Sequence, residues 1–120
     1  MPKEYQPQEL SFQIGGYFGS SYSVEWANEN LVYQADDEKT SLNPSQEEWT
    51  KFWQGLEELN VWDWERRYMP EEEIVDGTSW KIVLQYQGQK IESSGSNAYP
   101  NQFSQFCDLV EELCGGREFK

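Results

Sequence analysis

The chain of 120 residues contains no histidine. Histidine is the commonest general base near neutral pH and the commonest side chain to bind metal ions. Its absence also removes the Ser–His and Cys–His pairs that activate many nucleophiles. We therefore expect no catalytic residues of these kinds, no cofactor and no bound metal ion.

Cysteine is scarce, and the two that are present are Cys107 and Cys114. They are seven residues apart in a helical pattern, which places them on one helix face about 10 Å apart along the axis. A disulfide forms without backbone movement only when the two Cα atoms lie within roughly 7 Å. Both cysteines are therefore predicted to be reduced residues of the core.

Positive charge is also scarce, since nine Lys and Arg residues stand against 22 Asp and Glu residues, a formal net charge of −13. Nucleic acids and anionic membranes are bound largely through Lys and Arg, so neither is an expected partner. A basic protein partner fits this charge, and so does a charge that only keeps the domain soluble. The acidic runs at 36–38 and at 71–73 with Asp76 lack the spacing of a twelve-residue calcium loop.

Long apolar runs are missing as well. No stretch reaches membrane length, and no basic start followed by an apolar run opens the sequence, so we expect a cytoplasmic protein. Aromatic residues, in contrast, make up 16% of the chain. Because each ring can bury roughly 150–250 Å², a single domain of this length can form a substantial core.

Two segments carry apolar residues at helical spacing. The first follows Ser45 and Glu48, which fit a capping box, and the second precedes Gly115-Gly116, which is typical of an αL stop. The first stripe consists of Trp49, Phe52, Trp53, Leu56 and Leu59. The second consists of Phe103, Phe106, Cys107, Val110, Leu113 and Cys114.

Alternating apolar and polar residues predict five strands, at 10–14, 22–26, 31–33, 80–86 and 90–93. Turn residues at 27–30 and at Gly88 join four of them into two hairpins, whereas 34–42 is predicted to be a polar connection. The helical stripe at 49–59 recurs at 103–113, and the strand start at 21–24 recurs at 79–82. The chain is therefore predicted to contain two β-hairpin–helix units.

The predicted fold is a two-layer α+β sandwich. It has an antiparallel sheet of about five strands, two helices on one face and a wetter opposite face. We divide the single domain, 1–120, into a flexible arm (1–8), a first ββα half (9–60), a connection (61–78) and a second ββα half (79–116).

Two motifs punctuate the second half. Asp76-Gly77-Thr78-Ser79-Trp80 begins a strand, and Ser94-Gly95-Ser96-Asn97-Ala98-Tyr99-Pro100 precedes the second helix, with Trp64 and Tyr68 upstream and Phe103 downstream. In these residues the chain resembles a set of small uncharacterised bacterial domains with D-G-x-x-W and S-G-x-N-A-Y-P signatures. The resemblance covers the second half well, and in the first half only a Gly-rich turn before a Y-x-V strand. It implies a bacterial α+β domain, with no established activity and no functional residues to carry over.

A polar group at the start of the second helix is one candidate binding site. Its residues are Thr78, Ser94, Ser96, Asn97 and Tyr99. Helix N-termini attract anions, although Ser and Asn at such a position also hydrogen-bond to their own backbone and fix the loop.

Arg66 and Arg67 form the only adjacent basic pair, which could clamp a carboxylate or be satisfied internally by the glutamates at 71–73.

Trp62 and Trp64 fit the helical stripes poorly and are expected to fold back over one end of the core. They are the tryptophans expected to reach the surface.

Three functions are compatible with these residues. The leading hypothesis is a non-enzymatic module that binds another protein through aromatic residues at loops and element ends. Those residues are Tyr17, Phe18, Trp62, Trp64, Tyr68 and Tyr99. The alternative is an acidic protein of the immunity or inhibitor type that neutralises a basic protein partner. The third is a hydrolase that uses two carboxylates, for which the sequence singles out no pair.

Overall fold

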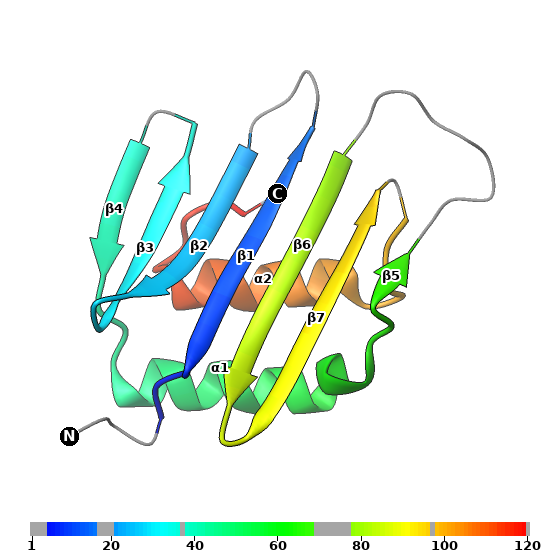
Figure 1. Cartoon of the computed structure of the whole chain (residues 1–120). Helices are drawn as coiled ribbons and strands as arrows, with labels where there is room; N and C mark the ends of the chain where they lie inside the picture. Colours follow the sequence, from blue (N-terminus) through cyan, green and yellow to red (C-terminus); the bar gives the residue numbers. More distant parts are fainter. Residues whose placement is uncertain (1–4, 17–20, 37, 69–77, 97, 120) are drawn as a thin grey trace.

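The computed structural model describes residues 5–16, 21–36, 38–68, 78–96 and 98–119. They form a single sheet with two helices packed behind one of its faces (Figure 1). The strands are β1 (Glu9–Gly16), β2 (Ser21–Ala27), β3 (Asn30–Ala35), β4 (Glu38–Leu42), β5 (Arg67–Tyr68), β6 (Thr78–Tyr86) and β7 (Gln89–Ser96). The helices are α1 (Gln46–Glu58) and α2 (Phe103–Leu113), and a short 3-10 helix, η1 (Val61–Asp63), follows α1.

The strand order is β4-β3-β2-β1-β6-β7-β5, with β1 at the centre (Figure 1). Each half of the chain extends the sheet away from β1 on one side. All neighbouring strands are antiparallel except β5, which runs parallel to β7. The predicted α+β architecture with two helices is therefore confirmed, but the sheet that the described residues form is mixed and has seven strands rather than about five antiparallel ones.

Strand β1 joins the two halves because it pairs with β2 on one side and with β6 on the other. Its residue Phe12 is fully buried. The Phe12 ring centroid lies 6.2 Å from that of Phe52 on α1, 5.2 Å from that of Phe106 on α2 and 6.5 Å from that of Phe119 near the C-terminus. One side chain thus connects the sheet, both helices and the C-terminal segment.

Helix α1 begins where the sequence predicts. The Ser45 hydroxyl accepts a hydrogen bond from the Glu48 N–H at 3.2 Å, and the Glu48 carboxylate accepts one from the Ser45 N–H at 3.2 Å. This is the capping box. On the buried face, the Trp53 ring stacks on that of Tyr86 with centroids 3.8 Å apart, which anchors α1 beneath β6.

Helix α2 also ends as predicted. Gly115 and Gly116 have φ of 72° and 92°. The Gly116 N–H donates to the Glu111 carbonyl at 2.8 Å, and the Gly115 N–H donates to the Glu112 carbonyl at 3.1 Å. These two bonds form a Schellman motif, in which glycine adopts the left-handed conformation without steric cost.

Two strands were not predicted. Residues 38–42, predicted to be a polar connection, form β4, where Leu42 lies opposite Leu31 and Thr40 opposite Tyr33. Arg67 and Tyr68, placed in the connection 61–78, form β5. Among the described residues, both strands lie at the edges of the sheet and have no neighbouring strand on one flank, where polar residues are tolerated.

The described part of the predicted arm lies against the core, while residues 1–4 fall outside the described residues. The Tyr5 carbonyl accepts a hydrogen bond from the Trp53 indole N–H at 2.7 Å. Pro7 is buried, and the Gln8 N–H donates to the Gln85 carbonyl at 2.8 Å. Residues 5–8 therefore do not behave as a loose arm.

The chain beyond the predicted second half is also fixed to the core. Phe119 is 1% exposed, and its N–H donates to the Glu111 carboxylate at 3.0 Å. The Tyr33 hydroxyl donates to the Glu118 carbonyl at 2.5 Å.

Cys107 and Cys114 are buried thiols, as predicted. No helix in the described ranges is long and apolar enough to span a membrane.

The turns of the two hairpins suggest one stabilising substitution. Asn28 and Glu29 have φ of 52° and 64°, and Gln87 and Gly88 have φ of 50° and 82°. These are the positive angles of type I′ turns, in which Asn-Gly is a favoured pair. Because a left-handed non-glycine residue costs roughly 1–2 kcal/mol, we predict that Glu29→Gly raises the free energy of unfolding by about 1 kcal/mol. Urea titration measures this.

The matched control is Gly88→Ala, at the corresponding position of the second hairpin, which should lower the free energy of unfolding by a similar amount. Unchanged or reduced stability of Glu29→Gly would show that this turn does not carry the expected strain.

The protein should lose stability as the pH rises above about 9. Burial raises the pKa of the Cys114 thiol from 9.0 to about 12, and burial also raises the pKa of the Tyr33 hydroxyl. Both groups ionise more readily in the unfolded chain. Their stabilising contribution is therefore complete below the unfolded pKa and is lost as the pH rises through the folded one.

Urea titrations from about pH 8 to about pH 11 measure this loss. The variant Cys114→Ala should lose less stability over this range than the parent protein. Equal pH dependence of the two proteins would contradict a role for the thiol.

Candidate functional site

The two motifs of the second half meet across β6 and β7. Trp80 lies opposite Gly95, and its indole N–H donates to the Ala98 carbonyl at 2.8 Å. A Cβ added to Gly95 would lie 2.5 Å from the Ala98 oxygen and 2.6 Å from the Trp80 indole nitrogen. Only glycine leaves room for the indole at this position. The Trp80–Gly95 contact therefore gives both motifs a structural role.

Aromatic rings from other elements surround the Trp80–Gly95 contact. The Trp80 centroid lies 4.8 Å from that of Phe103, 5.8 Å from that of Tyr68 and 6.5 Å from that of Trp64. The Tyr99 ring lies 6.4 Å away and nearly parallel. Among the large apolar side chains of the described ranges, Tyr99 alone is exposed, at 42%.

The candidate aromatic residues therefore lie mainly in the core and at its border. Trp62 and Trp64 are half-buried, and Trp64 packs against Phe106 with centroids 5.5 Å apart. Tyr68 is also half-buried. The aromatic candidates Tyr17 and Phe18, and Asn97 of the predicted polar group, lie outside the residues that the structure describes.

The residues of the predicted polar group lie on different faces of the sheet. Ser94 and Ser96 belong to β7 rather than to a loop, because β6 and β5 both pair with this segment. They alternate with Gly95, which faces the core, so both serines face away from the helices. Thr78 begins β6, and Tyr99 packs on Phe103. Helix α2 itself begins at Phe103, and its N-cap has no side-chain hydrogen bond.

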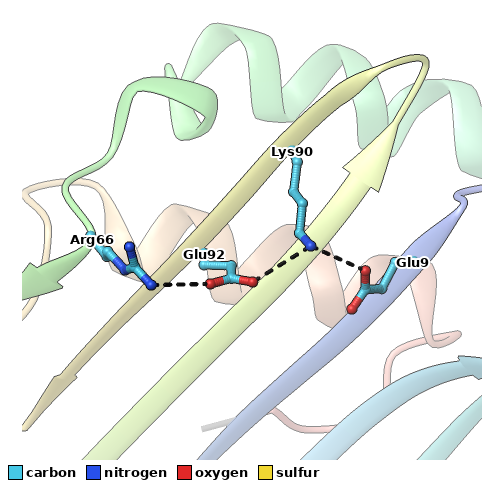
Figure 2. Close-up of polar contacts among 4 residues, drawn as sticks. All are labelled: Glu9, Arg66, Lys90 and Glu92. Carbon is cyan, nitrogen blue, oxygen red and sulfur yellow. Dashed lines mark ion pairs between the residues drawn. The ribbon is translucent and has the colours of Figure 1, made fainter.

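A chain of ion pairs lies on the face away from the helices, which we call the open face (Figure 2). Nη2 of Arg66 lies 3.7 Å from Oε2 of Glu92. Nζ of Lys90 lies 3.6 Å from Oε1 of Glu92 and 3.6 Å from Oε2 of Glu9. The carboxylate partner of Arg66 is therefore Glu92 on β7. The glutamates at 71–73, predicted to satisfy the arginines, lie outside the described residues.

Beside this chain, the strand register aligns one row of side chains across the whole sheet. No described segment covers it. From β4 to β5 the row consists of Lys39, Gln34, Ser23, Gln13, Lys81, Ser94 and Arg67. We call it the cross-sheet row. It contains three cations and no carboxylate, although the net charge of the chain is −13.

Two hollows on the open face meet at Lys81. One, of about 420 Å³, includes Gln13, Ser23 and Gln34 in its lining. The other, of about 310 Å³, is lined by Arg66, Arg67, Lys81, Glu92, Ser93 and Ser94. Arg67 and Ser94 were predicted as members of separate groups, and Lys81 was not predicted as a site residue. Its signal was its place among the polar residues that alternate with the apolar ones of β6.

The helical layer carries mostly negative charge, in contrast to the cross-sheet row. Its exposed carboxylates on α1 are Glu47, Glu48, Glu57 and Glu58, and those on α2 are Asp108 and Glu112. Lys51 is the single basic residue of the two helices. A hollow of about 190 Å³ between the helices includes Glu48 and Glu112, but the Glu48 carboxylate already serves the capping box.

The described acidic residues do not gather around one point. In the ranges that the structure covers, no group of three or more His, Cys, Asp or Glu side chains could hold a metal ion. The Asp36 carboxylate accepts a hydrogen bond from the Ser21 N–H at 3.2 Å, which fixes the end of the β2–β3 hairpin.

No protein-family model matches this chain, and neither the curated proteins nor the solved structures include a significant match to it. The similarity to bacterial domains with D-G-x-x-W and S-G-x-N-A-Y-P signatures stays a prediction. The site must therefore be interpreted from its own chemistry.

The Trp80–Gly95 contact predicts that Gly95→Ala is strongly destabilising. Overpacking a core typically costs about 1–3 kcal/mol, and loss of the Trp80 hydrogen bond leaves a buried group that adds about 1–3 kcal/mol. We expect a loss of about 2–4 kcal/mol in the free energy of unfolding, measured by urea titration. The control Ser96→Ala, one residue further along β7, should stay within about 0.5 kcal/mol of the parent. A Gly95→Ala protein as stable as this control would disprove the steric argument.

Proposed function

We propose that the protein is a small non-enzymatic binding module that recognises another protein with the open face of its sheet. The observation that carries this proposal is the separation of charge between the two layers. The helices carry mostly carboxylates, whereas the cross-sheet row carries none. Such a surface differs from its surroundings in charge and can orient a partner.

The size of the open face supports this function. Seven strands spaced about 4.8 Å apart make the cross-sheet row roughly 29 Å long, and strands of seven or eight residues run roughly 25 Å in the other direction. The product, about 700 Å², is close to the roughly 800 Å² that each partner buries in a standard protein interface.

The composition of the open face also supports protein binding. Val32 and Val83 are half-buried and share the adjacent row with two serines and two glutamates, Ser11, Ser41, Glu25 and Glu92. Interfaces of non-obligate complexes have a similar mixture of apolar and polar groups. The side chains stand on strands whose other face is packed, as at Val24 and Leu84, so the surface is formed before a partner arrives.

A second candidate function is an acidic protein of the immunity or inhibitor type, and the helical layer favours it. The six exposed carboxylates of α1 and α2 would attract a basic protein surface. The two candidates use opposite layers of the molecule, so they can be separated by experiment.

For either function we propose a cytoplasmic location, since both cysteines are buried thiols and disulfides are rare in that compartment.

The test compares one bulky substitution on each layer. A partner is first captured from native cell lysate, identified by mass spectrometry and purified. The variant Ser23→Tyr places a ring in the cross-sheet row, and its matched control Thr50→Tyr places one on the exposed side of α1. We expect Ser23→Tyr to weaken the affinity at least tenfold and Thr50→Tyr to leave it unchanged, as measured by calorimetry. Thermal unfolding verifies that both variants fold.

The reverse pattern would overturn the open-face proposal in favour of the acidic inhibitor. Failure to capture any partner, or unchanged affinity in both variants, would overturn both functions.

A further inference from the structure

Three residues of the cross-sheet row stand side by side at one edge of the sheet. Arg67 on β5 lies opposite Ser94 on β7, and Ser94 lies opposite Lys81 on β6. Side chains that face each other on adjacent strands have Cβ atoms about 4.5–5.5 Å apart. Two cations therefore flank one hydroxyl, and all three line the hollow of about 310 Å³.

The polar groups of these three side chains have no described partner. No carboxylate in the described ranges lies within ion-pairing distance of Arg67 or Lys81, whereas their neighbours Arg66 and Lys90 are paired with Glu92 (Figure 2). The Ser94 N–H donates to the Arg66 carbonyl at 3.0 Å, and within the same ranges its hydroxyl makes no hydrogen bond. The hydrogen-bond donors of Arg67, Lys81 and Ser94 therefore border the hollow without a partner among the described residues.

We propose that Arg67, Ser94 and Lys81 form a receptor for a carboxylate of an acidic segment on the partner protein. This inference rests on the proposed open-face function and names the chemistry of its partner. The guanidinium of Arg67 presents two parallel N–H groups that match the two carboxylate oxygens. The Lys81 ammonium and the Ser94 hydroxyl can donate to the remaining lone pairs.

The local charge favours a few separate carboxylates over a dense polyanion. Glu92 borders the hollow, and the whole chain carries a net charge of −13. A nucleic acid would need several phosphates neutralised at once, which one arginine and one lysine cannot provide. A single carboxylate needs only the groups present here.

The rest of the cross-sheet row defines the length of the segment. Gln13, Ser23 and Gln34 follow Lys81 and offer hydrogen bonds to a peptide backbone. Lys39 ends the row on β4 and has no ion pair in the described chain. It lies four strand spacings, roughly 19 Å, from Lys81. An extended segment with a second acidic residue about six positions from the first would reach both ends.

The probe is a synthetic ten-residue peptide with glutamate at positions two and eight and neutral polar residues elsewhere. It is titrated into the isotope-labelled full chain and followed by NMR. We expect shifts of the amide signals of Arg67, Lys81 and Ser94 and of the Arg67 guanidinium signal. The double variant Arg67→Gln/Lys81→Gln should weaken binding at least tenfold. The control Arg66→Gln/Lys90→Gln removes the same charge from paired residues of the same face and should change the affinity less than threefold.

Three results would overturn the receptor. The first is the absence of shifts at these residues. The second is equal binding of the peptide to the parent protein and to the double variant Arg67→Gln/Lys81→Gln. The third is equal shifts with inorganic phosphate or with a matched lysine peptide, which would show that no carboxylate is selected.

The failure of this inference is distinguishable from that of the proposed function. If Ser23→Tyr abolishes binding of the captured partner while Arg67→Gln/Lys81→Gln retains it, the open face binds the partner by other contacts and the receptor is wrong. If neither variant affects the captured partner, both proposals are wrong.

Discussion

The packing of the Trp80 indole on Gly95 is the interaction on which the second half of the sheet depends. Its N–H donates to a carbonyl just beyond β7 and so fixes the path of the chain toward α2. The same ring contacts Tyr68 and holds the two-residue strand β5 at the edge. Because successive strand residues point to opposite faces, the neighbours Ser94 and Arg67 must face away from the helices. An apolar contact on one face therefore positions the polar groups on the other.

The sequence predicted those elements whose signals are local. The capping box at Ser45, the glycine pair after α2 and the alternation along β6 each act within a few residues, and the structure confirms them. Strand β4 was missed because its residues 38–42 contain one large apolar side chain and pair only at an edge. Strand β5 has two residues and exists through contacts with β7, about thirty positions away in the chain. Long-range pairing of this kind leaves little local signal.

The candidate site was predicted in fragments for the same reason. The sequence singled out Arg67 in a basic pair and Ser94 in a polar group, and it gave no indication that they are neighbours. Lys81 was not singled out, since one lysine in an alternating strand is an ordinary exposed residue. The register of β5, β7 and β6 brings the three together, and it depends on the packing of the opposite face.

The turn at Gln87 and Gly88 has a consequence for how this protein can diversify. It fixes the register of β6 and β7, and a one-residue slip turns every side chain of a strand to the opposite face. A single insertion there would bring Ser94 inside and expose Ile91. Related chains should therefore not tolerate length changes in this turn. Substitutions at outward positions such as Lys81 can meanwhile alter binding specificity without repacking the interior.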